Sequence, residues 1–215
     1  MVERVILADL ARQHGTPLFV YSKAAILAAL ASYQRGLAGR SALICYAMKA
    51  NSSLAILKLL MDAGCGFDIV SGGELERALA VGATPSKIIF SGIGKTRAEM
   101  RRALEVGIGC FNVESMAELD VLNEAAVAAG VRAPVSIRVN PNVDARTHPY
   151  ISTGLKGNKF GIAHEQALTA YRQCKVDFCP YADEFGARKG EDAVDRAALL
   201  DVLTDFLEAN NLKVD

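Results

Sequence analysis

A short apolar run, a turn of small residues and an amphipathic helix recur in this order along much of the chain. The runs return roughly every 20 to 25 residues, and strands that alternate with helices in this way form parallel sheets with right-handed crossovers. The short and regular spacing favours a β/α barrel of the TIM type over a doubly wound sheet, although the pattern allows either. The predicted strands are residues 43–48, 66–70, 87–90, 109–113 and 135–139.

The helices between these strands carry start and stop signals. Three of them begin with a capping box, in which a hydroxyl and a glutamate satisfy the first free amides. These boxes are Ser71/Glu74, Thr96/Glu99 and Ser115/Glu118. Glycines stand where the helices are expected to end, at Gly64, Gly82, Gly107 and Gly130. An earlier helix, capped by Ser22, is expected to pack on the outside of the barrel through Ile26, Leu27, Leu30 and Tyr33.

Five strands cannot close a (β/α)8 barrel, so the predicted fold is an α/β barrel that is incomplete. Residues 176–181 are a candidate sixth strand, and residues 193–210 have the pattern of a later barrel helix. The role of the segment from Cys174 to Gly190 has no explanation in the sequence. The predicted organisation is one partial barrel domain over residues 1–215, without a second β-domain after it.

Composition narrows the class of partner. The 215 residues are 51% hydrophobic and 22% charged, and 24 basic side chains balance 24 acidic ones. Such a neutral balance gives no field that attracts nucleic acid, and no apolar stretch reaches the ~20 residues of a membrane span. Cys45, Cys65 and Cys110 lie within or beside apolar strands, which suits a reducing compartment. Cys174 and Cys179 have no second pair or histidines near them, so no metal site is expected. We therefore expect a cytoplasmic protein with a small-molecule partner.

Polar residues follow each of the predicted strands. In a barrel or a doubly wound sheet, the functional face lies at the carboxyl ends of the strands, so these residues predict a site. They are Lys49, Asp68, residues 91–92, residues 112–114 and residues 138–140.

Lys49 is the strongest candidate for chemistry. Burial beside a strand end would penalise its ammonium form and leave an amine nucleophile, which is what a Schiff-base lysine requires. The alternative is an ordinary surface lysine at a strand end. Asp68 needs a partner for its charge, and a cationic ring or the lysine amine would provide one. Arg138 either points inward and is paired, or faces outward under a helix.

Three further motifs favour plain structural interpretations. The run from Ser91 to Thr96 contains Gly-Lys-Thr but lacks the first glycine of a phosphate loop, which indicates a tight turn with a helix cap. The Ser71-Gly72-Gly73-Glu74 run can be a capped turn only. His148 lies in a predicted long loop over residues 141–159, where a histidine is usually solvated.

Several of these motifs, taken in order, resemble the diaminopimelate decarboxylase family of fold-type III pyridoxal-phosphate enzymes, which is related to the ornithine and arginine decarboxylases. The resemblance covers about residues 15–171. Its motifs are GTPLFVY (15–21), YAMKAN (46–51), GFDIVSGGEL (66–75), FNVES (111–115), HPYISTG (148–154) and NKFGI (158–162).

The resemblance implies a barrel of the alanine-racemase-like fold that binds pyridoxal 5'-phosphate. It implies that Lys49 carries the cofactor as a Schiff base and later handles protons at the substrate α-carbon. It places Asp68 and Glu74 near the cofactor, and gives Arg138 a part in fixing the network beside the lysine. The implied reaction is decarboxylation of meso-diaminopimelate to L-lysine, by an enzyme that is a homodimer at full length.

The chain also departs from the family. Family members are roughly twice as long, and their His-Ile-Gly-Ser-Gln, Gly-Gly-Gly and Glu-Pro-Gly-Arg segments do not occur in this sequence. We therefore expect weak or no turnover from these residues alone. Three alternatives stay open: a non-catalytic cofactor-binding or regulatory paralogue, a single-domain racemase or carrier barrel with the same lysine, and a nucleotide-binding domain that rests only on Gly94-Lys95-Thr96.

Overall fold

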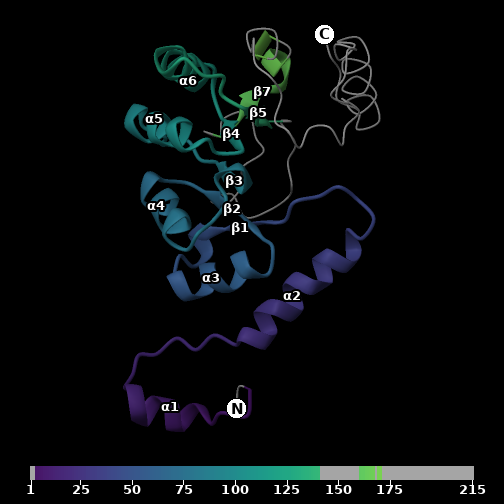
Figure 1. Ribbon diagram of the computed structural model, residues 1–215, viewed down its shortest axis with the longest axis vertical. Coiled ribbons are helices and arrows are strands. Elements are labelled where there is room, and N and C mark those ends of the chain that lie inside the picture. The colour runs from purple at the N-terminus through teal and green to yellow at the C-terminus, as the bar shows by residue number, and fades with distance from the viewer. Residues whose placement is uncertain (1–2, 141–159, 168, 171–215) are drawn as a thin grey trace.

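Five parallel strands form one sheet in which each strand pairs with the next along the chain. The computed structural model describes residues 3–140, 160–167 and 169–170. Each strand lies inside a range predicted from the sequence. The strands are β1 (Cys45–Ala47), β2 (Gly66–Ile69), β3 (Ile88–Phe90), β4 (Cys110–Val113) and β5 (Val135–Ile137) (Figure 1).

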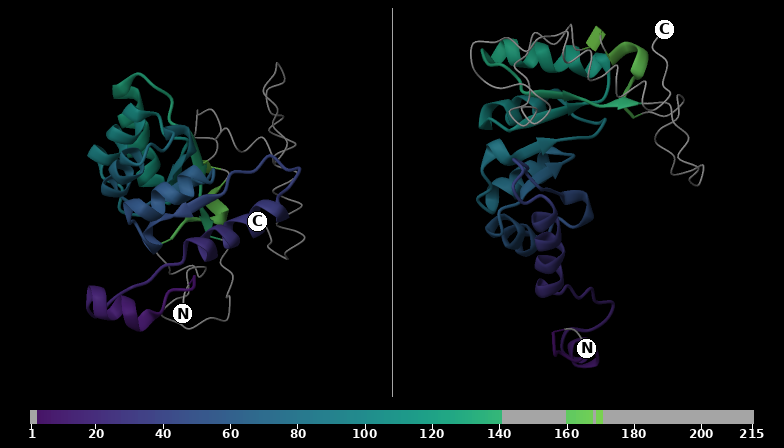
Figure 2. Two further views of the ribbon diagram at one scale, coloured as in Figure 1. Left: turned by 60° about the horizontal axis from the view of Figure 1, so that its bottom comes forward. Right: turned by 90° about the vertical axis from the view of Figure 1, so that its right-hand side faces the viewer.

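Helices follow the first four strands and lie together on one face of the sheet (Figure 1 and Figure 2). They are α3 (Leu54–Asp62), α4 (Gly72–Ala80), α5 (Arg97–Val106) and α6 (Met116–Ala129). A doubly wound sheet would place helices on both faces and reverse its strand order at one point. The sequential order β1-β2-β3-β4-β5 with helices on one face is the arrangement of a β/α barrel, as predicted.

The sheet continues past β5 through a second small pairing. Strand β6 (Val139–Asn140) pairs in parallel with β7 (Ile162–Ala163). Between β5 and β6, the Arg138 amide donates to the Val113 carbonyl at 2.9 Å, and the Arg138 carbonyl accepts from the Ile162 amide at 2.8 Å. Strand β7 therefore lies beside the end of β5 in a second, two-stranded sheet, and the candidate sixth strand of the sequence, residues 176–181, stays a prediction. Those residues lie outside the described ranges.

The predicted helix signals are present, with one difference in the capping boxes. Ser71, Thr96 and Ser115 all accept the predicted amide through their side chains, but the full reciprocal box is found at α5 only. In α4 and α6 the glutamate carboxylate reaches one residue further back, and accepts the amides of Val70 and Glu114. Gly107 and Gly130 end α5 and α6 in the left-handed conformation that glycine adopts without strain.

The core lies between the sheet and this helix layer. Its largest buried side chains include Phe67, Phe90 and Phe111, one from each of three neighbouring strands. The rings of Phe90 and Phe111 stack with their centroids 6.2 Å apart. Burial of such rings contributes about 1.5 to 3 kcal/mol each, so they are the main support for the sheet.

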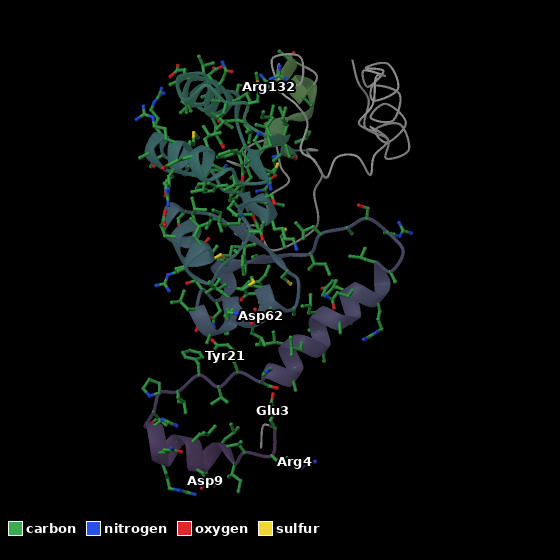
Figure 3. The ribbon with its side chains drawn as sticks, in the orientation of Figure 1. Glu3, Arg4, Asp9, Tyr21, Asp62 and Arg132 are labelled. Carbon is green, nitrogen blue, oxygen red and sulfur yellow. The ribbon has the colours of Figure 1, made fainter. Side chains whose placement is uncertain are left out.

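The N-terminal segment is far less buried. Helix α1 (Leu7–His14) has no buried residue, and Phe19 and Tyr21 between α1 and α2 are 85% and 56% exposed (Figure 3). Helix α2 (Lys23–Gly36) begins at the predicted Ser22 cap and contacts Leu60 and Cys65 of the barrel through Leu30.

One residue of the predicted packing face of α2 is placed differently. Tyr33 is 66% exposed, so its assignment to this face was wrong. The reason is that α2 meets the barrel in a small contact around Leu30, joined by Ile26.

Candidate active site

The carboxyl ends of β1 to β5 lie at one edge of the sheet, because the strands are parallel. In the last three residues of β2, β3, β4 and β5, the two outer residues face the helices and are buried, and the residue between them is only partly buried. Asp68, Ile89, Asn112 and Ser136 belong to the second set, so they line the face that the helices leave uncovered. Two of these four, Asp68 and Asn112, bring polar groups that interact at this edge.

Lys49 stands at this edge in a 3-10 turn, Met48–Ala50, directly after β1. Neighbouring Met48 is fully buried and fixes the turn to the core, whereas Lys49 itself is exposed. Within the described ranges, its amine makes no hydrogen bond or ion pair. The predicted burial of Lys49 is therefore wrong for this structure. The physical reason is that β1 is the first strand of the sheet, with a paired neighbour on one side only.

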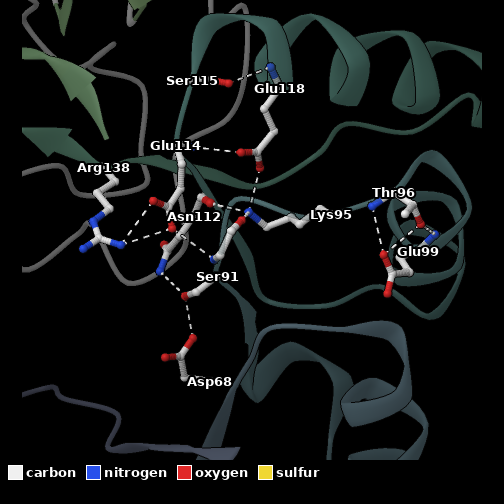
Figure 4. A network of polar contacts seen from close by, with 11 residues as sticks. Asp68, Ser91, Lys95, Thr96, Glu99, Asn112, Glu114, Ser115, Glu118 and Arg138 are labelled. Atoms are coloured by element: carbon white, nitrogen blue, oxygen red, sulfur yellow. Dashed lines mark hydrogen bonds and ion pairs between the residues drawn. The ribbon is translucent and has the colours of Figure 1, made fainter. Parts of the chain in front are cut away.

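Asp68 is held by a chain of hydrogen bonds that crosses three strands. The Ser91 hydroxyl donates to an Asp68 carboxylate oxygen at 2.5 Å, and the Asn112 amide group donates to the Ser91 hydroxyl at 2.9 Å (Figure 4). The predicted need of Asp68 for a partner is met by this hydroxyl, and not by a contact with Lys49. A donated hydrogen bond fixes the orientation of the carboxylate.

Arg138 is paired, as one of the two interpretations of the sequence predicted. One of its terminal nitrogens, Nη1, lies 3.2 Å from both carboxylate oxygens of Glu114. The guanidinium carbon also lies 5.0 Å from the centre of the Phe160 ring. The Arg138 side chain is 45% exposed and the Glu114 side chain only 2%. The pair thus joins a buried anion to a cation that reaches the surface of the rim.

Lys95 belongs to the interior of the turn after β3. Its side chain is fully buried, and its amine donates to the carbonyls of Gly92 and Asn112 at 2.7 Å each and to Glu118 at 2.6 Å. All three donor positions of the ammonium group are thereby used. The plain interpretation of the Gly-Lys-Thr run as a structural turn is confirmed, and the nucleotide-binding alternative loses the cation on which it depended.

Glu74 takes a structural contact in this structure. Its carboxylate accepts the Val70 amide at 2.7 Å, and its own amide donates to the Ser71 hydroxyl. The carboxylate thus ties the end of β2 to the first turn of α4. Within the described part of the chain, no contact joins Glu74 to Lys49, Asp68 or Arg138, so its predicted place at the cofactor stays a prediction.

Glu114 is the site residue that sequence reasoning did not assign. It is one of two buried polar residues among those described. A glutamate directly after an apolar strand was visible in the sequence as part of the rim, but nothing local revealed that it would be buried opposite an arginine 24 positions away. No group of metal-binding side chains was found in the described ranges. In the same ranges, no helix is long and apolar enough to cross a membrane.

Comparison with known proteins assigns the chain that carries this rim to a protein family. Residues 23–177 match the family described as pyridoxal-dependent decarboxylase, pyridoxal binding domain. The diaminopimelate decarboxylase of Pseudomonas aeruginosa is 59% identical over 176 residues, which are 81% of this chain and 42% of that protein. The enzyme of the same name from Vibrio cholerae is 58% identical over 79% of this chain and 41% of its own. The chain thus spans about two fifths of the length of these relatives.

Solved structures agree with this assignment. Diaminopimelate decarboxylase from Helicobacter pylori, complexed with L-lysine, superposes with a TM-score of 0.76 at 38% identity, over 97% of this chain and 55% of that one. The enzyme from M. jannaschii in co-complex with L-lysine gives a TM-score of 0.75 at 33% identity, over 100% of this chain and 53% of that one. The partial parallel sheet, the lysine after its first strand and the matched residues 23–177 together show that the chain belongs to the pyridoxal-dependent decarboxylases, in their pyridoxal-binding domain.

Proposed function

We propose that this chain is the cofactor-binding part of a diaminopimelate decarboxylase, which converts meso-diaminopimelate to L-lysine and carbon dioxide. The observation that carries the proposal is the position of Lys49, whose amine is exposed after β1 at the same edge as Asp68 and Arg138. The names of the relatives and the lysine bound in related structures support the choice of substrate.

The residues at the rim fit pyridoxal 5'-phosphate in their chemistry. The cofactor needs an amine for its aldehyde, and Lys49 offers one without a described partner. Its phosphate is anionic, and Arg138 supplies a cation for it, whereas a cationic ring can face the fixed carboxylate of Asp68. When bound, the cofactor supplies an electron sink for the electron pair that remains after carbon dioxide leaves.

Each residue of the chain has a separate task in this proposal. Lys49 holds the cofactor covalently and, once released by substrate, moves a proton at the substrate α-carbon. Asp68 keeps a fixed orientation because Ser91 and Asn112 hold it, so its charge can face a cationic ring. Arg138 brings a positive charge to the rim from the end of β5. Glu74 is proposed to approach the cofactor from the first turn of α4.

The setting of the enzyme is part of the same proposal. Among the described cysteines, Cys65 and Cys110 are buried, as small apolar side chains of a protein in a reducing cytoplasm often are. We propose that the full-length protein is a homodimer, as the family resemblance implies. A non-catalytic cofactor-binding paralogue remains the outcome to exclude by assay.

The test combines visible absorbance with mapping of the attached lysine. The full-length protein is mixed with pyridoxal phosphate, reduced with borohydride and digested, and the modified peptide is identified by mass spectrometry. We expect a band near ~420 nm and label on Lys49, since its amine is exposed and has no described partner, so it is available to the aldehyde of the cofactor. Label spread over several surface lysines would contradict the proposal.

Lys58→Ala is the matched control, because Lys58 is an exposed lysine of the neighbouring helix α3 and pairs with Asp62. This variant should keep the band, whereas Lys49→Ala should lose it. Release of carbon dioxide and L-lysine from meso-diaminopimelate then tests the reaction. Cofactor binding without release from meso-diaminopimelate, L-ornithine or L-arginine would identify a non-catalytic paralogue.

A further inference from the structure

Three contacts restrain the backbone of Arg138. Its amide bonds to β4 and its carbonyl bonds to β7, so the residue joins the two sheets of the described structure. Gly161 packs against this point with a φ of +80°, and a Cβ on it would come within 3.0 Å of the Arg138 carbonyl oxygen. The backbone of Arg138 therefore has little freedom, and the position of its guanidinium depends on what the side chain contacts.

Glu114 supplies the contact that decides this position. Its carboxylate is buried directly after β4 and accepts Nη1 of Arg138 with both oxygens. The same carboxylate accepts the amide of Gly92, in the turn after β3, at 3.0 Å. In Figure 4 the second terminal nitrogen of Arg138 points away from Glu114. Glu114 thus fixes one edge of the guanidinium and directs the other edge away from itself.

A buried carboxylate in this place is costly unless it serves a partner. An unpaired buried ion loses much of its hydration free energy, and Glu114 offsets this loss through an arginine that is itself 45% exposed. An arginine this exposed could satisfy its charge in water without Glu114. The arrangement therefore holds the guanidinium in place at the expense of burying an anion. Residues that fix the orientation of a functional side chain are placed in this way.

We propose that Glu114 is a positioning residue, which holds the Arg138 guanidinium at the rim in the orientation that receives the anionic cofactor. The cofactor part of this inference rests on the proposed function. Through Gly92, the same carboxylate joins the turn after β3 to the end of β5, so that the Asp68 and Arg138 parts of the rim are kept in register.

The positioning is tested first without cofactor. Phenylglyoxal modifies accessible arginines, and the rate at Arg138 is followed by mass spectrometry of its peptide in the full-length protein. Glu114→Gln should raise the rate at Arg138 several-fold, because the guanidinium loses its ion pair. An unchanged rate at Arg138 would overturn the proposal.

The matched control is Glu76→Gln. Glu76 pairs with Arg102 at 2.8 Å, and Arg102 is 41% exposed, close to the value for Arg138. This change should leave the rate at Arg138 as in the wild type. Should Glu114→Gln not fold, Glu114→Asp retains the buried charge but withdraws the carboxylate by one methylene, and the same increase in labelling is expected.

The second step is a double-mutant cycle on the dissociation constant of pyridoxal phosphate. We expect Glu114→Gln to weaken binding by about tenfold, the scale seen when a supporting contact is removed from a binding group. In an Arg138→Met background, the same change should have little further effect, because Glu114 acts through the arginine. An equal loss in both backgrounds would mean a merely structural role and would overturn the proposal.

The two steps separate this inference from the proposed function. If the wild type shows no Lys49-dependent band, the proposed function fails, while phenylglyoxal labelling still decides whether Glu114 holds Arg138. If labelling rises but cofactor affinity does not change in Glu114→Gln, the proposed function stands and the positioning role for the cofactor is wrong.

Discussion

The turns after β1 and β3 both contain a lysine, and the two lysines have opposite surroundings. Lys95 is fully buried and donates to three oxygens, whereas Lys49 is exposed and has no partner within the described ranges. The sequence around Lys95 looks more like a binding motif, since it contains Gly-Lys-Thr. The comparison teaches that a lysine whose three donor positions are all taken supports the fold, and that an amine available for chemistry must be left without such partners.

The strongest test of this contrast is Lys49→Ala. Lys49 contributes no described contact, so the free energy of unfolding should change by no more than about 0.5 kcal/mol. The Lys49-dependent absorbance band and any turnover should be lost completely, because no other group can take its covalent role. Spectroscopy and thermal unfolding of the same sample check both statements. A band that persists at wild-type intensity would remove Lys49 from the site.

Lys95→Met should have the reverse effect. The change leaves Glu118 and two carbonyl oxygens without their buried donor, which costs about 3 to 5 kcal/mol of unfolding free energy. Chemical denaturation of the full-length protein measures this loss. Cofactor attachment to Lys49 should survive under conditions in which the variant is folded. A stable Lys95→Met protein that fails to bind cofactor would reverse the assignment of the two lysines.

Glu118→Gln is a milder change in the same cluster. The amide can still accept from Lys95, but the charge that balances the buried ammonium is lost. We expect a decrease of about 1 to 3 kcal/mol in unfolding free energy, smaller than that of Lys95→Met. The comparison of the two denaturation midpoints checks the order. A larger loss in Glu118→Gln would mean that the carboxylate, and not the lysine, organises the turn.

The smallest effect concerns pH and the cap of α5. Burial alone raises the pKa of Glu99, but hydrogen bonds from the Gly72 amide and from the amide and hydroxyl of Thr96 bring it below its ordinary value of 4.5. Because the folded pKa is lowered, this stabilisation is present above 4.5 and is lost as the pH falls through the lowered value.

Glu99→Gln should therefore make the unfolding free energy less dependent on pH in the acid range. Denaturation midpoints measured between neutral pH and acid check this. If the unfolding free energies of the wild type and the variant fell equally with pH in the acid range, protonation of Glu99 would not contribute to acid unfolding.

Local signals in the sequence account for most of the fold. All five strands were predictable, because apolar runs, hydroxyl caps and glycine ends act within a few residues of one another. Their sequential order was favoured over a doubly wound order only by the short and regular spacing. The position of β7 was missed, since a two-residue strand carries too little pattern. The exposure of Lys49 and of Tyr33 was also missed, because burial depends on which elements pack over a residue.

The position of the candidate site, at one edge of the sheet, was predictable from the sequence. The hydrogen bonds and ion pairs between its residues were not. Parallel strands bring their carboxyl ends together, so Lys49, Asp68 and Arg138 had to share one rim. The partners of Asp68 and Arg138 could not be read from the sequence, because the contacts Asp68–Ser91, Ser91–Asn112 and Glu114–Arg138 join residues more than 20 positions apart. Register and side-chain direction, which set these meetings, are properties of the folded sheet.

The sequential order of the strands also has a consequence for how the protein is made. Each of β2 to β5 pairs with the strand that precedes it in the chain, so within this sheet the pairing of the described strands needs no distant partner. Contacts between neighbours in sequence form quickly, since the loops that they close are short. The sheet can therefore grow one strand at a time as the chain leaves the ribosome, and the rim is assembled in the order in which its residues are translated.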